Sequence, residues 1–328
     1  MERRTLGRTG LPVSRLGLGG LFVSQVGGPY EQAREAIHRA IDLGINYLDT
    51  APGYLNSEEV LGRALADVDA PLVLSTKLGG RPQPFNGQDP DQLRASFRES
   101  LRLLGRDYVD MLIIHEPDRP GQYDWWTDKE HYDGPVMDVL AELREQGRIG
   151  YIGLGGTTAY ELARIIRTGK FDVVLTAFNY SLLWREAEIE VLPAAVEQGM
   201  GIIIGSPLQQ GALSRRYDDE VRHGAPWLSQ PRREQYLRLY ALLDELGMPI
   251  AELAMRFVFA NAHVDTVLTG ARSAQEVEQN MATLAKGPLP EDVLARLDEI
   301  AAMVPFRPFE EPFGLPFTRP YAGPGPAA

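Results

Sequence analysis

The fold is indicated by one segment, residues 71–117, which reads PLVLSTKLGGRPQPFNGQDPDQLRASFRESLRLLGRDYVDMLIIHEP. Two apolar runs, residues 71–79 and 108–117, flank an amphipathic stretch that ends at Gly105. The apolar runs are continuous rather than alternating, which is typical of strands buried on both faces. A strand, a helix closed by glycine and a second strand predict a unit of a parallel sheet.

The same alternation continues through most of the chain. We expect strands at residues 15–23, 45–51, 71–79, 108–117, 149–156, 171–180, 201–208 and 264–271. Amphipathic stretches between them include residues 31–44, 57–68, 91–105, 135–147, 159–169 and 185–199. Eight strands separated by helices predict an α/β fold, the (β/α)8 TIM barrel. An open doubly wound sheet is the alternative, but the glycines at 17–20 lie within a strand-like run and lack the dinucleotide-binding spacing.

Three segments exceed what a barrel requires. Residues 3–17 predict a hairpin across the bottom of the barrel, and residues 116–134 form a long loop after the fourth strand. We expect one barrel domain over residues 1–304 and an aromatic, proline-rich tail over residues 305–328, disordered at its end. Loops after barrel strands lie on the catalytic face.

A tryptophan pair in the long loop is a candidate substrate contact. Trp125 and Trp126 are adjacent, and a surface loop on the catalytic face places them in a pocket wall or lid. The alternative is that both indoles pack the loop onto the barrel.

The composition limits the classes of binding partner that the protein is expected to have. The chain has 328 residues, a formal net charge of -12 and no cysteine. The charge argues against nucleic-acid or membrane binding, and the missing thiols exclude disulfides and thiolate metal sites. No run has the length of a membrane span or the pattern of a signal peptide. We therefore expect a cytoplasmic protein with a small-molecule substrate, whose monomeric or homo-oligomeric state the sequence leaves open.

Four ionisable residues are expected at one rim of the barrel. Asp49, Lys77 and His115 end three consecutive strands, and Tyr54 follows the first of them. Alone, such residues usually cap helices, meet solvent or satisfy local hydrogen bonds. Together, at the face where barrel enzymes react their substrates, they predict a catalytic site.

The predicted chemistry is proton transfer by a phenol. We expect Lys77 to lower the pKa of Tyr54, and Asp49 to keep the Lys77 ammonium charged. His115 is expected to orient a carbonyl oxygen. Since thiols, a serine elbow and a metal-ligand cluster are all missing, the remaining component is expected to be an electron carrier.

With these residues, the chain resembles the aldo-keto reductase family. The motifs INYLDTAPGY, LSTK, SLRLLGRDYVDMLIIHEPD, FNYSLL and GIIIGSPL occur in the family's order and span almost the whole chain. The sequence is most similar to the aldose and sugar dehydrogenase branch. The resemblance implies a NAD- or NADP-dependent oxidoreductase in which Tyr54 is the general acid or base, tuned by Lys77 and Asp49, and His115 positions the substrate oxygen.

The resemblance also implies a cofactor site. Its candidate residues are Thr157, Asn179, Ser206, Leu208, Gly211, Gly270, Arg272, Glu276 and Asn280. The chain departs from the family at the nicotinamide: no Ser-Asn pair follows the fifth strand, Ala177 stands where a glutamine is expected, and Gly205 where an aromatic ring is common. Glu276 would repel a 2′-phosphate and accept hydrogen bonds from ribose hydroxyls, which favours NAD slightly over NADP, although Arg272 is able to contact a phosphate.

Two other functions remain open at the level of sequence. One is a cofactor-binding regulatory or interaction subunit with little turnover, as some members of the fold family are. The other is a metal-dependent hydrolase using His115, Asp49 and His131, although no strand carries a His-x-His pair.

Overall fold

The centre of the molecule is a closed barrel of parallel strands. The computed structural model describes residues 1–119, 121–226 and 228–306. Around the barrel the strands follow the order β10, β3, β4, β5, β6, β7, β8, β9. They are β3 (Leu16–Gly19), β4 (Tyr47–Asp49), β5 (Val73–Leu78), β6 (Val109–His115), β7 (Ile149–Gly156), β8 (Val173–Ala177), β9 (Gly201–Gly205) and β10 (Thr266–Thr269). The predicted (β/α)8 barrel is confirmed, and each of the eight apolar runs contains one strand.

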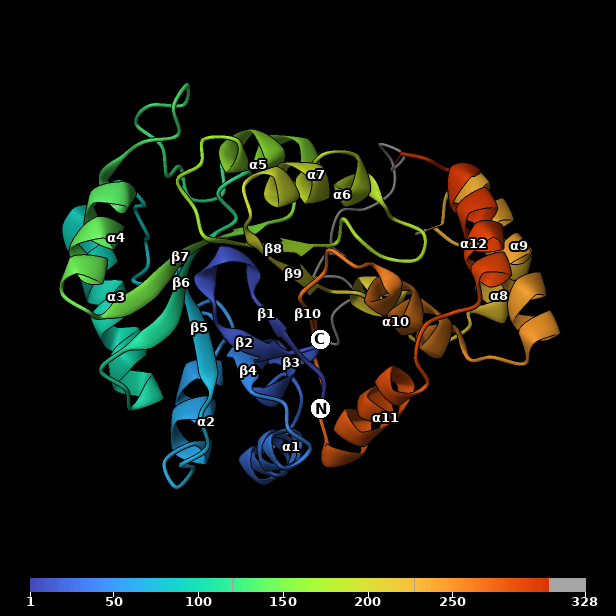
Figure 1. Ribbon diagram of the computed structural model, residues 1–328, viewed down its shortest axis with the longest axis horizontal. Coiled ribbons are helices and arrows are strands. Elements are labelled where there is room, and N and C mark those ends of the chain that lie inside the picture. The colour runs from blue at the N-terminus through green and yellow to red at the C-terminus, as the bar shows by residue number, and fades with distance from the viewer. Residues whose placement is uncertain (120, 227, 307–328) are drawn as a thin grey trace.

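Helices surround the barrel (Figure 1). They are α1 (Tyr30–Asp42), α2 (Ser57–Ala64), α3 (Pro90–Leu104), α4 (Pro135–Glu145), α5 (Ala159–Ile166), α6 (Glu186–Ile189), α7 (Val191–Glu197), α8 (Asp218–His223), α9 (Gln230–Leu246), α10 (Ile250–Ala260), α11 (Ala274–Ala285) and α12 (Glu291–Ala302). Short 3-10 turns are η1 (Gly7–Thr9), η2 (Gly20–Val23) and η3 (Gln209–Gly211). Within the described residues, no helix is long and apolar enough to span a bilayer.

The N-terminal segment closes one end of the barrel. Strands β1 (Arg3–Thr5) and β2 (Pro12–Ser14) pair antiparallel, which confirms the predicted hairpin. Leu6 and Val13 are fully buried in the same apolar cluster as the residues that fill the barrel interior. Gly7, with φ +45°, lies so close to the start of β9 that a Cβ atom would stand 2.2 Å from the backbone nitrogen of Gly201.

The first barrel strand is shorter than the apolar run that predicted it. Strand β3 ends at Gly19, and residues 20–23 form η2. A Cβ atom on Gly20 would lie 2.5 Å from the Ser57 hydroxyl and 2.7 Å from the Asp49 carbonyl. The chain therefore turns at a position where only glycine fits against the end of β4 and the start of α2.

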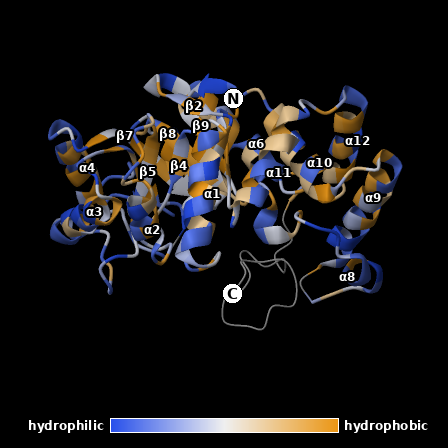
Figure 2. Cartoon of the chain, turned by 90° about the horizontal axis from the view of Figure 1, so that it is seen from below, coloured by the Kyte–Doolittle hydropathy of each residue, from blue (hydrophilic) through white to orange (hydrophobic). Residues whose placement is uncertain are grey.

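The long gap before β10 contains helices that extend the barrel to one side. Helix α9 packs against both α8 and α12, and the three lie together beyond α10 in the views of Figures 1 and 2. The expected tail over residues 305–328 falls outside the described residues apart from its first two.

Candidate active site

Three adjacent strands bring the four predicted site residues to the carboxyl end of the barrel. Asp49 is the last residue of β4, His115 is the last of β6, and Lys77 lies one residue before the end of β5. Parallel pairing places these strand ends side by side. Tyr54 follows β4 in a turn closed by a hydrogen bond from its N–H to the Ala51 carbonyl, 3.0 Å long.

Lys77 is the centre of the group. Its Nζ atom donates to Asp49 Oδ2 at 2.6 Å and to the Thr50 carbonyl at 2.8 Å. The same atom lies 4.7 Å from the centre of the Tyr54 ring, and the charge of each group acts on the pKa of the other. Asp49 and Thr50 thus accept two of the three N–H donors of the ammonium, and its positive charge lies beside the Tyr54 ring.

The pKa of Lys77 follows from this arrangement. Burial favours the neutral amine, but Asp49 and Tyr54 outweigh it, and the pKa of Lys77 is raised. Lys77 is therefore a buried ammonium at physiological pH, as the sequence predicted.

Two further hydrogen bonds, made by Ser75 and Tyr47, hold the Asp49 carboxylate in place. Ser75 Oγ donates to Asp49 Oδ1 at 2.6 Å, and Tyr47 lies 2.9 Å from the same serine oxygen. Because the single serine proton goes to the carboxylate, the Tyr47 hydroxyl is the donor in the second contact. Neither residue was predicted from the sequence, although Ser75 lies two positions before Lys77 and faces the same side of β5.

The pKa of the Tyr54 phenol differs from the one expected from the sequence. Burial raises the pKa of Tyr54, and it outweighs the opposing charge of Lys77; Asp49 and, more weakly, Glu116 add to the rise. The prediction of a lowered pKa is wrong because the side chain is half-buried and two carboxylates oppose the effect of the ammonium on its pKa. Tyr54 is thus protonated at neutral pH.

His115 stands next to the phenol. The two rings meet edge to face with their centroids 5.8 Å apart. Burial lowers the pKa of His115 to about 3, with the charge of Lys77 adding to the effect. The imidazole is therefore neutral, and its buried Nδ1 has no hydrogen-bond partner among the described residues.

The tryptophan pair packs the long loop onto the barrel. Trp125 is 2% exposed and Trp126 is 6% exposed. Their indole N–H groups donate to the carbonyls of His115 and Pro117, each at 3.0 Å. The structure favours the packing alternative over an exposed lid. The ring nearest His115 in this loop is instead that of half-buried Tyr123, at 6.3 Å between centroids, which the sequence analysis did not single out.

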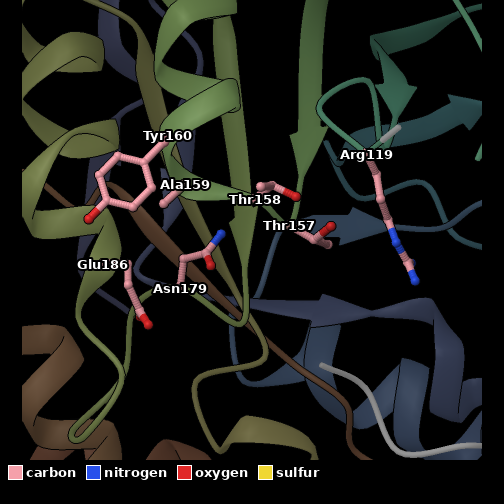
Figure 3. Close-up of a pocket in the computed structure, with 7 residues that line it drawn as sticks. All are labelled: Arg119, Thr157, Thr158, Ala159, Tyr160, Asn179 and Glu186. Atoms are coloured by element: carbon pink, nitrogen blue, oxygen red, sulfur yellow. The ribbon is translucent and has the colours of Figure 1, made fainter. Parts of the chain in front are cut away.

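A cavity of about 280 Å³ lies beside the rim, between the loops that follow β7 and β8 (Figure 3). It is lined by Arg119, Thr157, Thr158, Ala159, Tyr160, Asn179 and Glu186. Two predicted cofactor contacts, Thr157 and Asn179, therefore share one cavity. The Thr157 hydroxyl is buried without a hydrogen-bond partner among the residues described, so it is available to a ligand.

Asp118 fixes the wall of this cavity. One of its carboxylate oxygens, Oδ2, accepts the N–H groups of Thr157 at 2.8 Å and Thr158 at 2.5 Å. Burial raises the pKa of Asp118 to about 6 despite these donors. The loop after β6 is thereby tied to the loop after β7, a link that sequence spacing alone did not reveal.

The predicted phosphate-binding loop follows β9. Ser206 and Gln210 have left-handed backbones, with φ of 54° and 51°, and Gly211 has φ 95°. Leu208 and Gly211 are partly exposed. Left-handed non-glycine residues are uncommon and gather at functional loops, so the backbone supports a binding role here without identifying the ligand.

The predicted adenosine segment is built around the start of α11. Ser273 caps the helix through Glu276 N–H, and Glu276 Oε2 accepts the Arg272 N–H at 2.8 Å. Glu276 thus has a structural task as well as the cofactor contact expected of it. Gly270 is exposed, and Asn280 lies partly buried two turns along α11 from Arg272.

The metal-dependent alternative has no support in the geometry. His131 lies exposed in the long loop, paired with Asp128, and is not joined to Asp49 or His115. Over residues 1–119, 121–226 and 228–306, no group of three or more potential metal ligands converges.

The barrel and its rim define a class of protein, and the comparison with family models names it. Residues 15–302 match the aldo/keto reductase family. The chain belongs to this family, as its motifs suggested, and is by that membership an oxidoreductase of the aldo/keto reductase type.

Individual relatives cover nearly the whole chain. L-galactose dehydrogenase of Arabidopsis thaliana is 30% identical, with 87% of this chain and 89% of that protein covered. A putative voltage-gated potassium channel subunit beta of Schizosaccharomyces pombe is 27% identical, covering 92% and 94%. Among solved structures, the holo form of an aldo-keto reductase from Bacillus halodurans has a TM-score of 0.75 at 26% identity, covering 95% and 100%.

Proposed function

We propose that this protein is a NAD(P)-dependent oxidoreductase that interconverts an alcohol and its carbonyl compound, with a sugar or aldose as the favoured substrate class. The observation that carries the proposal is the buried Lys77 ammonium, which donates to Asp49 and Thr50 and lies 4.7 Å from the centre of the Tyr54 ring. The similarity to L-galactose dehydrogenase supports the substrate class.

Tyr54 is the acid and base of this reaction. The Lys77 ammonium lies beside the phenol, and the O–H of Tyr54 donates to a substrate oxygen. In reduction, the carbonyl oxygen takes that proton while the carbonyl carbon receives a hydride; in oxidation, both transfers reverse. Lys77 stabilises the phenolate that each reduction leaves behind.

Neutral His115 positions the substrate. With a pKa near 3, the imidazole carries no charge at physiological pH and directs one N–H to the substrate oxygen. That oxygen then receives two hydrogen bonds, from His115 and from Tyr54, and its position relative to the phenol is fixed.

The cofactor fits the residues present. When bound, the nicotinamide supplies or accepts the hydride. Thr157 and Asn179 would hold its carboxamide, since the unpartnered Thr157 hydroxyl offers both a donor and an acceptor. Ser206, Leu208 and Gly211 would wrap the pyrophosphate, and the segment from Gly270 to Asn280 would hold the adenosine. Glu276 favours NAD slightly over NADP.

Replacement of Tyr54 by phenylalanine tests this function. Loss of the proton donor lowers kcat by about 10²–10⁴-fold, while cofactor binding, followed by quenching of protein fluorescence, stays within twofold. Tyr108→Phe is the matched control, since Tyr108 is exposed just before β6 at the opposite end of the barrel. Turnover that survives in Tyr54→Phe contradicts the role given to Tyr54.

A cofactor-binding regulatory subunit is the second candidate, and the similarity to a potassium channel subunit beta supports it. One measurement distinguishes the oxidoreductase from the regulatory subunit. Nicotinamide absorbance is followed with a panel of aldoses, aromatic aldehydes, steroids and pyridoxal. Tight cofactor binding without turnover of any compound favours the regulatory role.

A further inference from the structure

Tyr123, in the long loop after β6, lies against the chain that leaves β5. A Cβ atom on Gly79 would stand 3.1 Å from Tyr123 Cε2 and 3.2 Å from His115 Cβ. A Cβ atom on Gly80 would stand 3.4 Å from the Tyr123 hydroxyl oxygen. Both glycines have positive φ, 127° and 88°, a conformation that residues with a side chain rarely adopt. The glycine pair therefore lets the Tyr123 ring approach both the backbone and His115 closely.

Aromatic neighbours fix the orientation of the Tyr123 ring. Its centroid lies 5.4 Å from that of Phe85 and 5.6 Å from that of Trp125, and both pairs meet edge to face. Trp125 is in turn held by the hydrogen bond from its indole N–H to the His115 carbonyl, 3.0 Å long. Because the Tyr123 side chain is only half-buried, it is positioned by the protein and still accessible to a ligand.

The Tyr123 hydroxyl group lies next to the backbone that carries Tyr54. The Cβ position on Gly80, 3.4 Å from this hydroxyl oxygen, is 3.6 Å from the Cα atom of Gly53, the residue before Tyr54. A Cβ atom on Gly53 would meet only His115 Cε1, at 4.0 Å, among the described residues that are not its chain neighbours. The centroids of the Tyr123 and His115 rings are 6.3 Å apart. Glycines thus leave space beside His115, and the Tyr123 hydroxyl borders it.

The Tyr123 phenol is able to hydrogen-bond a substrate hydroxyl group. Burial raises the pKa of Tyr123, and the exposed Gln122 side chain opposes the rise, so the phenol keeps its proton at physiological pH. A phenol both donates and accepts hydrogen bonds, and a substrate hydroxyl group does the same. The ring adds an apolar face for the carbon atoms of the substrate.

We propose that Tyr123 selects 2-hydroxy carbonyl compounds, such as aldoses, through a hydrogen bond to the hydroxyl group next to the reacting carbon. The inference rests on the proposed oxidoreductase function and narrows its substrate class. The substrate oxygen binds to Tyr54 and His115, and the adjoining Tyr123 side chain then meets the substituent on the neighbouring carbon. A substrate without a hydroxyl group at that carbon leaves the phenol unpaired once water is displaced, which disfavours such a substrate.

The test compares two aldehydes that differ by one hydroxyl group, lactaldehyde and propanal. The wild-type protein reduces lactaldehyde with the higher kcat/KM. Tyr123→Phe lowers the kcat/KM for lactaldehyde about three- to tenfold, the effect of one neutral hydrogen bond, and changes that for propanal less than about twofold. Phenylalanine keeps the ring against Phe85 and Trp125, so the variant retains its fold, which is checked by thermal unfolding.

Tyr132→Phe is the matched control. Tyr132 belongs to the same loop, but its hydroxyl donates to Glu161 at 2.7 Å and its ring packs against Trp126. The substitution removes a phenol from the loop without changing the groups beside His115. The ratio of the two kcat/KM values therefore stays at the wild-type level in this variant.

The outcomes separate the inference from the function on which it rests. An unchanged ratio of the two kcat/KM values in Tyr123→Phe overturns the role of Tyr123 and leaves the oxidoreductase function intact. Equal losses for both aldehydes give the same result, since they show that Tyr123 only supports the site. Turnover of other compounds in the panel but of neither lactaldehyde nor propanal also overturns the inference. Failure of the wild-type protein to reduce any compound in the panel overturns the proposed function itself.

Discussion

The rim formed by β4, β5 and β6 contrasts with the loops that follow β8, β9 and β10. At the rim, Asp49 and Lys77 are 2% and 1% exposed, and the strands fix their positions. In the loops, Phe178, Ser206 and Gln210 have left-handed backbones and are partly exposed. Asp49, Lys77 and His115 thus lie on regular structure, and the predicted cofactor contacts after β8 and β9 lie on irregular structure.

This contrast has a physical origin. A strand end moves only if the barrel ladder moves with it, so Asp49, Lys77 and His115 keep their distances to one another. Loops after barrel strands change length and composition at little cost to the core. Substitutions at the rim are therefore expected to act on both stability and turnover, and substitutions in the loops mainly on ligand preference.

The largest effect is expected from Lys77→Met. It leaves the Asp49 carboxylate buried without its cation, which costs about 3–5 kcal/mol of unfolding free energy, and removes the partner that stabilises the phenolate. We expect turnover to fall at least about 10²-fold. Urea unfolding and nicotinamide absorbance measure the two effects.

The double variant Asp49→Asn/Lys77→Met is the control for that experiment. With no charge left in the buried pair, most of the lost stability returns, because the main cost in the single variant is the unpaired carboxylate. Turnover stays low, since no ammonium faces Tyr54. Recovery of both stability and turnover would show that Lys77 has only a structural role.

Ser75→Ala is expected to have an intermediate effect. The hydroxyl donates to Asp49 and is held by Tyr47, and loss of such a bond to a charged group costs about 1.5–3 kcal/mol. A less firmly held carboxylate supports the Lys77 ammonium less well. Because the pKa of Lys77 is raised in the native protein, we expect the alkaline limb of the kcat/KM profile to move to lower pH by about half a unit.

The same raised pKa fixes the sign of the pH dependence of stability. The stabilisation that the Lys77–Asp49 pair contributes is fully present below the unfolded-state pKa of about 10.4 and is lost as the pH rises through the native pKa of Lys77.

Ser96→Ala is the matched control for Ser75→Ala, since Ser96 is equally buried and its hydroxyl has no partner among the described residues. An equal shift of the rate profile in both variants would refute a role for Ser75.

The sequence was sufficient to predict the rim because its signal is local. Asp49, Lys77 and His115 end continuous apolar runs, and parallel strands of a barrel bring their carboxyl ends to one face. The eight barrel strands followed from the same runs, and the N-terminal hairpin followed from residues 3–17. In each case the evidence lies within about ten residues of the position concerned.

Other features could not be predicted because they depend on distant contacts. Asp118 holds the backbone at Thr157, 39 positions away, and Tyr47 reaches Ser75 across 28 positions. The raised pKa of Tyr54 depends on burial, which the DTAPGY motif does not reveal. Trp125 resembled a lid residue by its place in a long loop, but the loop folds back and buries its indole.

The smallest effect is expected in the loops, from Glu276→Gln. Glutamine can still accept the Arg272 N–H that Glu276 now accepts at 2.8 Å, so the start of α11 stays intact and unfolding changes by less than about 0.5 kcal/mol. The lost negative charge is expected to lower the KM for NADP about three- to tenfold and to leave kcat unchanged, because a partly exposed charge acts weakly on a bound phosphate. Glu278→Gln, two residues further along α11 and paired with Arg39, is the control. If the ratio of the KM values for NAD and NADP changes equally in Glu276→Gln and Glu278→Gln, the effect is one of net charge, and Glu276 does not recognise the ribose hydroxyls.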